Sequence, residues 1–495
     1  MSKTIKIILM FVLILTLSAC QSETPNPTPG GNDETNPPIN ESEETPEFDR
    51  RAIPDELPDT DLGGREFNLL CHEMLTVEFV AEEQNGDTVN DALYKRNTDV
   101  SERFNVVINM IQIPGSWDDR EPFMRTVRNS VQAGDATYDL VAGVTSYIPL
   151  LIPQGIFMDI NTVGHLDFAK PWWGEDWITE LSIGDKLYLV TGDIALSMWD
   201  CMFVFYFNKQ LVQDNDLPDL YETVKSGQWT FDKFSELSKT ISKDLNGDGV
   251  YDKNDMFGFV TTTGTVVNAF PGGFDLAITY KDENNIPHPQ LNIEKWSDAA
   301  AKLFDLHHNT QSTLVLPPDA SDYNIIVPMF QENRALFFPQ TLSFAGTMRA
   351  METDFGILPF PMYDGNQKNY CSVIRNAMSL IGIPATVSSP GDCGLIMAAL
   401  AAESYKTVIP AYYDIALKVK QTRDDESGEM LDIIRGSIWM NFGYSYSLST
   451  GGIGNYMREL IEQKNPNFTS VYDASIASRT KIFDKFIADV LNLGT

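Results

Sequence analysis

A twelve-residue acidic loop is the segment of this sequence whose spacing points most directly to chemistry. Oxygen-bearing side chains stand at loop positions 1, 3, 5, 9 and 12, and Gly249 stands at position 6, where a calcium loop turns sharply. The expected Ca²⁺ ligands are these side chains and the carbonyl of Val250 at position 7: Asp244, Asn246, Asp248, Asp252 and Asp255. The chain has a single such loop with an Asp at position 12, so we expect a structural ion. A solvated Asn-Gly-Asp-Gly turn is the alternative interpretation.

Tryptophans beside turns form a second group of candidate site residues. Sugar rings stack their C–H faces on tryptophan, and their hydroxyls hydrogen-bond with Asp, Asn and Arg. Trp172 and Trp173 lie in a polar stretch flanked by Pro and Gly, Trp199 precedes Asp200, and Trp439 is followed by Asn441 and a Gly-, Ser- and Tyr-rich run. Burial in the core is the competing interpretation for each tryptophan taken alone. Together the group predicts a carbohydrate cleft.

Motifs of established catalytic sites are missing from this sequence. The five histidines do not show metal-protease spacing, and neither a G-x-S-x-G elbow nor a phosphate loop occurs. A carboxylate pair for glycoside hydrolysis stays open, because among 69 acidic residues some pair is always close in space. We therefore expect a non-enzymatic binding protein, with a lipoprotein glycoside hydrolase as one alternative.

The N-terminus has the pattern of a lipoprotein signal peptide. Lys3 and Lys6 precede an apolar run over 7–15, and small residues stand just before Cys20. The run is far shorter than the roughly 20 residues that a spanning helix needs. We expect removal of residues 1–19 and lipid, such as palmitate, on Cys20, which would hold the chain on the outer face of the cell membrane. Residues 20–60 have the composition of a disordered tether.

Length and charge limit what the remaining residues can form and bind. About 435 residues follow the tether, which is more than usually fold around one hydrophobic core, so two lobes are expected. A net charge of −33 argues against nucleic acid as a partner and favours a neutral ligand. Four cysteines are widely spaced, and either buried free thiols or one disulfide would fit: Cys71, Cys201, Cys371 and Cys393.

Strand and helix patterns alternate along the first part of this domain. Strands are predicted at 67–71, 106–113 and 138–144, with helices near 89–100 and over 122–132. This order predicts an α/β fold with a largely parallel sheet. Later strands are predicted at 187–190, 203–207, 335–338 and 355–360 and helices at 232–242 and 295–307, and the chain beyond 395 is mostly helical.

The order of several short segments resembles the extracellular solute-binding proteins of family 1, the capture lipoproteins of ABC-type importers. These segments are Gly86 to Ala92 with Arg96-Asn97, Lys170-Pro171-Trp172-Trp173, Gly192-Asp193, Phe207-Asn208-Lys209, Gly227 to Phe231, the acidic loop and Phe355 to Pro361.

The resemblance implies a two-lobed, periplasmic-binding-protein-like fold whose lobes are joined by crossover strands near 192–207 and 358–379. It also implies that the cleft closes on a small solute, here a sugar, which passes to permease subunits. We expect a monomer with lobe I formed by 61–190 and 325–360, and lobe II by 191–324 and 361–495. A ligand sensor or adhesion lipoprotein is the other alternative.

Overall fold

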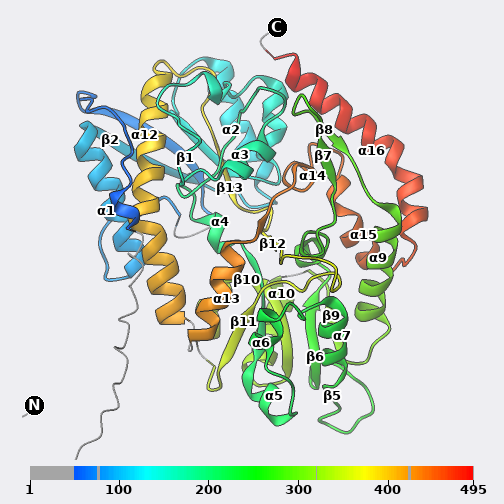
Figure 1. The fold of residues 1–495 in the computed structure, drawn as a ribbon. Coiled ribbons are helices and arrows are strands. Elements are labelled where there is room, and N and C mark those ends of the chain that lie inside the picture. Colours follow the sequence, from blue (N-terminus) through cyan, green and yellow to red (C-terminus); the bar gives the residue numbers. More distant parts are fainter. Residues whose placement is uncertain (1–48, 75–77, 319, 350, 422–424, 494–495) are drawn as a thin grey trace, which may run out of the picture. The chain divides into compact units, whose positions relative to one another are not determined.

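The computed structural model describes residues 49–74, 78–318, 320–349, 351–421 and 425–493. The signal peptide, Cys20 and most of the predicted tether lie outside these ranges. Residues 50–495 form one compact unit, which contains two separate main sheets with helices around each. We call the part around the first sheet the first lobe and the part around the second sheet the second lobe (Figure 1).

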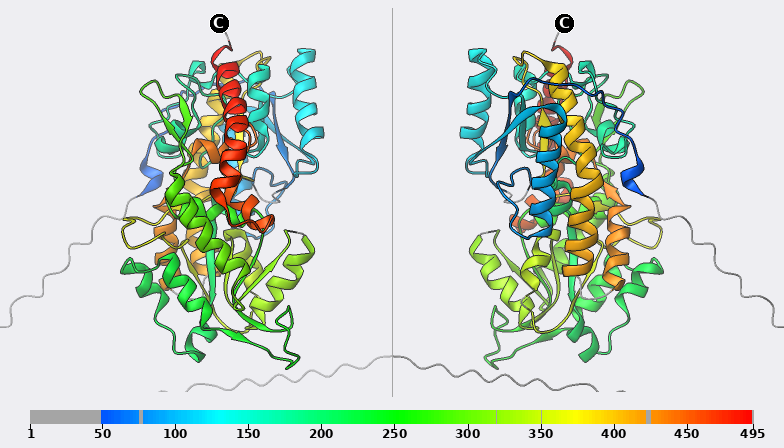
Figure 2. Two further views of the ribbon diagram at one scale, coloured as in Figure 1. Left: turned by 90° about the vertical axis from the view of Figure 1, so that its right-hand side faces the viewer. Right: turned by 90° about the vertical axis from the view of Figure 1, so that its left-hand side faces the viewer.

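The first lobe is built on a four-stranded sheet in the order β13-β3-β1-β2. Strands β1 to β3 are parallel and β13 runs antiparallel to β3. The bounds are β1 Arg65–His72, β2 Val106–Ile113, β3 Leu140–Val144 and β13 Ser379–Gly382. Helices α1 (Thr88–Phe104) and α12 (Pro390–Glu403) pack side by side, and α2 spans Arg120–Ala133 (Figure 2). These elements confirm the predicted parallel strand-helix-strand beginning of the domain.

Local sequence explains why α1 begins and ends where it does. The Asp87 side chain accepts hydrogen bonds from the N–H groups of Val89 and Asn90, which the first turn of a helix leaves unpaired. Asn105, at the other end, adopts a left-handed conformation with φ of 46° and closes the helix. The buried residues of α1 include Val89, Leu93 and Val100, as the periodicity of apolar residues predicts.

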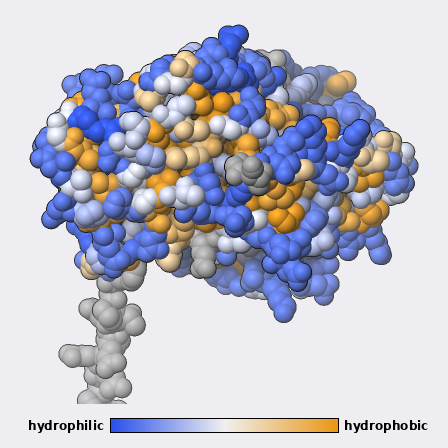
Figure 3. All heavy atoms as spheres, turned by 90° about the horizontal axis from the view of Figure 1, so that it is seen from above, coloured by the Kyte–Doolittle hydropathy of each residue, from blue (hydrophilic) through white to orange (hydrophobic). Residues whose placement is uncertain are grey.

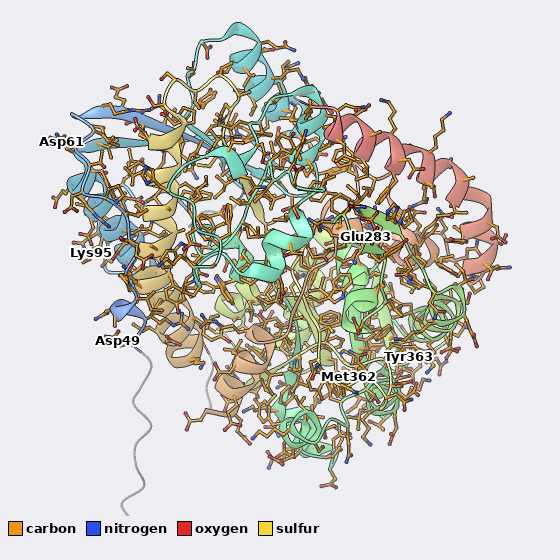
Figure 4. The ribbon with its side chains drawn as sticks, turned by 45° about the horizontal axis from the view of Figure 1, so that its top comes forward. Asp49, Asp61, Lys95, Glu283, Met362 and Tyr363 are labelled. Atoms are coloured by element: carbon orange, nitrogen blue, oxygen red, sulfur yellow. The ribbon has the colours of Figure 1, made fainter. Side chains whose placement is uncertain are left out.

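The second lobe is built on a six-stranded mixed sheet in the order β11-β4-β10-β6-β5, with β9 pairing with β6. The bounds are β4 Phe203–Asn208, β5 Ser242–Lys243, β6 Met256–Thr262, β9 Thr313–Leu316, β10 Ala335–Thr341 and β11 Phe355–Leu358. Strands β6, β9 and β10 are parallel, and β4 runs against β10 and β11. Figure 4 shows Lys95 of α1 with the first lobe and Met362, which follows β11, with the second.

Aromatic packing forms the core of the second lobe. The fully buried ring of Phe205 lies 4.7 to 6.4 Å, centroid to centroid, from six other rings: Trp229, Phe234, Phe259, Phe270, Phe337 and Phe360. Most of these pairs are edge-to-face, the arrangement that the ring quadrupole favours. On the face shown in Figure 3, by contrast, hydrophilic residues are interspersed with smaller apolar groups.

The remaining elements are short segments and the helices of the second lobe and the C-terminal part. The short ones are η1 Arg50–Ala52, η2 Ile148–Gln154, η3 Ile160–Thr162, α3 Glu175–Leu181, α4 Ser197–Asp200, η4 Thr265–Asn268, α8 Ala269–Gly273, β7 Thr279–Lys281, β8 Pro287–Pro289, η5 Leu342–Phe344, α11 Ala345–Met348, β12 Ser372–Val373, β14 Ile438–Trp439, α14 Phe442–Ser445 and η8 Ile453–Asn455. The helices are α5 Lys209–Asp214, α6 Leu220–Lys225, α7 Phe231–Lys239, α9 Ile293–His308, α10 Ala320–Gln331, α13 Asp425–Arg435, α15 Tyr456–Glu462 and α16 Phe468–Leu491, with the π-helices η6 Ser404–Val408 and η7 Ala411–Gln421.

The last helix contacts both lobes. Helix α16 packs against α9 of the second lobe and against η2 of the first (Figure 2). Lys186 Nζ, in the first lobe, donates a hydrogen bond of 3.1 Å to the carbonyl of Leu491 at the end of this helix. The chain therefore has a helical contact between the lobes in addition to the segments that cross from one sheet to the other.

Strand pairing divides the chain differently from the predicted lobe boundaries. Strands β10 and β11, which were expected in lobe I with 325–360, pair in the second sheet. Strand β13, which was expected in lobe II with 361–495, pairs with β3 in the first sheet. The physical reason is that a strand hydrogen-bonds to a neighbouring strand that can lie far away in the sequence. The residue pattern of the strand itself does not specify that neighbour. Segment 187–190 forms a single bridge, Val190 to Ile381, rather than a strand.

The end of the predicted tether contacts the folded domain. Residues 50–52 form η1, and Ile53 and Leu57 pack against the core. Asp55 forms an ion pair of 2.5 Å with Arg103 on α1. These contacts arise because the last part of the tether, unlike the part before it, carries apolar and charged residues that match the domain surface. The four cysteines that follow the tether are all free.

Candidate functional site

A cavity of about 360 Å³ lies where strand ends of both sheets meet. Met74 and Ser146 follow β1 and β3 of the first sheet, and Thr265 and Pro318 follow β6 and β9 of the second. Ligands of open α/β sheets bind in the crevice outside the carboxyl ends of parallel strands, and this cavity has that position in both lobes. We call it the interlobe cleft. Its described lining residues are Met74, Trp117, Val144, Ser146, Gly264, Thr265, Pro318, Tyr323, Arg375, Asn376, Ala377, Ser447, Leu448, Asn455 and Arg458.

Two adjacent crossing segments join the lobes at this cleft. Residues 191–202 lead from the first lobe to β4, and residues 359–378 lead back from β11 to β13. Met202 and Ile374 form an antiparallel bridge, and the N–H of Arg375 donates a 2.8 Å hydrogen bond to the carbonyl of Cys201. The two segments lie near 192–207 and 358–379, where the family resemblance implied crossovers. Arg375, Asn376 and Ala377 of the second segment also line the cleft.

Trp117 gives the cleft an exposed aromatic surface. Its residue surface is 52% exposed, although the large aromatic side chains of this chain are mostly buried. The guanidinium of Arg120, at the start of α2, lies 4.2 Å from the ring centroid and also donates to the carbonyl of Trp117. Arg120 therefore covers one face of the indole, and the rest of the ring is available to stack on a sugar.

Two polar atoms of the cleft residues are buried without a hydrogen-bond partner in the described part of the chain. They are Nε of Arg375 and Oγ of Ser447, whose residue is 3% exposed. Arg458 differs, because its Nε donates a 2.6 Å hydrogen bond to Glu462. Polar groups buried in a protein are normally paired, so both atoms are open to a hydrogen bond with water or a bound solute.

A buried carboxyl group connects the first crossing segment with the start of β13. Oε2 of Glu78 accepts a 2.8 Å hydrogen bond from the Ser379 hydroxyl, and Oε1 accepts one of 3.2 Å from the N–H of Ser197. The Ser197 hydroxyl in turn accepts the N–H of Ser379 at 2.8 Å. Burial raises the pKa of Glu78 to about 7, and the hydrogen bonds from the two serines oppose that shift.

The tryptophans predicted from sequence lie elsewhere. Trp172 and Trp173 are 2% and 0% exposed and belong to the first-lobe core. Trp199 is also buried and donates a 3.3 Å hydrogen bond to Asp193, and Asp200 accepts one of 2.5 Å from Tyr412. None of these four residues is among the described residues that line the interlobe cleft. Their environment matches the interpretation as core residues.

Trp439 and Asn441 are also separate from the interlobe cleft. The Asn441 side chain caps α14 and hydrogen-bonds with Thr279, so it supports the local fold. Trp439 lines a larger and shallower hollow of about 1080 Å³, together with Asp275, Lys295 and the loop over 364–371. The described residues that line this hollow include no strand end of the first sheet. We favour the smaller interlobe cleft as the functional site because residues from both lobes line it.

The predicted calcium loop forms a tight turn that its own backbone closes. Oδ2 of Asp244 accepts the N–H of Gly249 at 2.8 Å, and Gly249 has the left-handed φ of 78° that a sharp turn requires. Asp255 accepts N–H groups from Leu245 and Asp252, which lowers the pKa of its carboxyl group. No three His, Cys, Asp or Glu side chains within the described ranges are arranged to hold a metal ion. Calcium binding therefore stays a prediction.

Comparisons with known proteins find a likeness in structure alone. No protein-family model matches the chain, and no curated protein matches it. The structure is similar to a cyclo/maltodextrin-binding protein complexed with maltotetraose (TM-score 0.53, 11% identity, covering 87% of this chain and 98% of that one).

Two further solved structures show the same likeness. The GacH receptor of Streptomyces glaucescens, solved unliganded and with acarbose, has a TM-score of 0.54 at 10% identity, covering 86% of this chain and 99% of that one. UgpB from Mycobacterium tuberculosis, in complex with glycerophosphocholine, has a TM-score of 0.51 at 14% identity, covering 87% and 98%. At these identities the likeness establishes the fold. The chain therefore has a two-lobed α/β fold of the periplasmic-binding-protein type.

Proposed function

We propose that the chain is the solute-binding lipoprotein of an ABC-type importer and that it captures a carbohydrate in the interlobe cleft. The observation that carries this proposal is a cavity lined by strand ends of both sheets, next to two adjacent crossing segments. A solute that touches both lobes makes more contacts when the lobes approach each other, so binding shifts the population toward a closed form. Permease subunits would then receive the solute from the closed form.

The chemistry of the cleft supports a carbohydrate. Trp117 offers an exposed ring face, and amide and hydroxyl groups lie around the same cavity, among them Asn376, Asn455 and Ser146. This combination suits a molecule with apolar C–H faces and many hydroxyl groups. Among the similar structures, one was solved with maltotetraose and another with acarbose. The similar structures are binding proteins, which supports a non-enzymatic role.

The N-terminal pattern supports attachment to the membrane by lipid on Cys20. Within the described ranges, no helix is both long and apolar enough to span a membrane. A lipid-anchored chain on the outer face would stay close to its permease. We also propose that the loop over 244–255 binds one structural Ca²⁺ ion. Its support is the ligand spacing and the turn at Gly249.

A ligand screen with the full-length chain in detergent tests this proposal. A ligand present at 100 times its dissociation constant stabilises the native state by about 2.7 kcal/mol, which thermal unfolding detects readily. We expect at least one saccharide to raise the melting temperature and to be recovered with unchanged mass. Amino acids, peptides and polyols serve as comparison classes. Slow loss of an oligosaccharide from the mixture would instead indicate a glycoside hydrolase, and a shift confined to peptides or amino acids would refute carbohydrate capture.

A further inference from the structure

Arg375 occupies a fixed position at the point where the second crossing segment meets the interlobe cleft. Its N–H is held by the carbonyl of Cys201 at 2.8 Å, and its own carbonyl accepts the N–H groups of Ala377 and Met378. These backbone bonds hold the residue in a tight turn beside the bridge between Met202 and Ile374. The side chain is half-buried and lines the cleft.

The guanidinium of Arg375 has no acidic partner among the residues that the structure describes. No ion pair or side-chain hydrogen bond of Arg375 occurs there, and its Nε is buried and unpaired. The other arginine of the cleft, Arg458, is already paired with Glu462 on the same helix. The described residues that line the cleft include no Asp or Glu. A positive charge thus faces the cleft of a chain whose net charge is −33.

A partly dehydrated and unpaired guanidinium is costly unless an anion pairs with it. The planar fork of arginine fits a carboxylate or phosphate through two parallel N–H···O bonds. Ser447, with its buried unpaired hydroxyl, offers a further polar partner in the same cavity. The arrangement therefore has the components for binding an oxyanion at one part of the cleft and for stacking a ring on Trp117 at another.

We propose that the captured solute is an acidic saccharide whose oxyanion pairs with Arg375 while a sugar ring stacks on Trp117. This inference rests on the proposed function and narrows its substrate class. It replaces the expectation of a neutral ligand, which came from the net charge of the whole chain. Charges separated by more than the Debye length of about 8 Å are largely screened in physiological salt, so the local guanidinium determines what the cleft binds.

Calorimetric titration of the full-length chain in detergent tests the inference with three probes. Trigalacturonate carries carboxylates, glucose 6-phosphate carries a phosphate, and maltotriose is neutral. We expect trigalacturonate or glucose 6-phosphate to bind more tightly than maltotriose, and the better of the two identifies the oxyanion. Arg375→Ala should raise its dissociation constant about 10- to 100-fold, as the loss of hydrogen bonds to a charged group predicts. Arg375→Lys, which keeps the charge but not the fork, should give an intermediate value.

Arg128→Ala is the matched control, because it also removes one positive charge but alters a side chain that contacts Gln154 outside the cleft. It should leave the affinity unchanged. The Arg375 variants should keep the wild-type melting temperature without ligand, because no side-chain hydrogen bond is lost. Tight maltotriose binding that Arg375→Ala leaves unaltered would overturn the acidic-saccharide inference and leave carbohydrate capture standing. Failure of all three probes, together with a blank saccharide screen, would overturn both.

Discussion

Replacement of Trp117 by alanine should weaken saccharide binding by roughly an order of magnitude. The residue is 52% exposed, which for a side chain of about 250 Å² leaves about 130 Å² accessible. A sugar stacked on one ring face would cover about half of that accessible area, roughly 65 Å², worth about 1.6 kcal/mol at 25 cal/mol per Å². This free energy corresponds to an increase of about 15-fold in the dissociation constant.

Calorimetric titration with the saccharide that gives the largest thermal shift measures this change. Trp117→Ala should keep the wild-type melting temperature without ligand, because substitutions of exposed residues usually change stability by less than about 0.5 kcal/mol. Trp117→Phe, with a smaller ring, should lose less affinity. Trp439→Ala is the matched control, since Trp439 lines a different hollow. Unchanged binding by Trp117→Ala, combined with lost binding by Trp439→Ala, would refute the assignment of the cleft.

Three further predictions concern other parts of the chain. If the loop over 244–255 binds Ca²⁺, a chelator should lower the melting temperature and Asp244→Ala should abolish that response; a chelator without effect on the wild type would refute calcium binding. Burial raises the pKa of the Glu78 carboxyl group to about 7 from an ordinary 4.5. The folded chain therefore keeps a proton on Glu78 that the unfolded chain loses, and this stabilisation is complete below pH 4.5 and is lost as the pH rises through 7. Glu78→Gln, which is neutral throughout, should flatten the fall of melting temperature between these pH values, and an identical slope would contradict the assignment. Cys20→Ala should move the chain from the membrane fraction to the soluble fraction, and full retention would exclude lipid on this residue as the anchor.

The sequence predicts the elements of the first lobe closely. The predicted strand over 106–113 has the bounds of β2, and the apolar positions Val89, Leu93 and Val100 are buried on α1. These elements are long and their local patterns agree with their tertiary environment. The two crossing segments lie near the positions that the family resemblance implied, because the order of the short segments along the chain carries topological information that periodicity does not.

Strand assignment to a sheet was not predictable in the same way. Strand β13 is a short apolar segment, Ser379–Gly382, whose pattern is equally suited to either sheet. It joins the first sheet through antiparallel pairing with β3, although the chain before it belongs to the second lobe. The division into lobes depends on such long-range strand pairings. Local sequence patterns therefore do not determine the lobe boundaries, which were predicted at 325 and 361.

The positions of several cleft residues in the sequence give a weak indication of the site, which residue type alone does not give. Trp117 follows the Pro-Gly-Ser that ends the β2 segment, and Ser146 and Thr265 likewise follow predicted or observed strand ends. Residues just beyond the carboxyl ends of parallel strands are the expected ligand contacts in this fold class. Arg375 had no such signal, because its place in the cleft depends on the turn between the crossing segment and β13.

The most direct test of the central claim is to titrate the full-length chain with the best saccharide, recover that saccharide and determine its mass. We predict saturable binding of one molecule per chain, loss of affinity in Trp117→Ala, and recovery of the ligand with unchanged mass after prolonged incubation. Cleaved saccharide, or binding that is indifferent to substitutions in the interlobe cleft, would contradict the account of this chain as a capture protein.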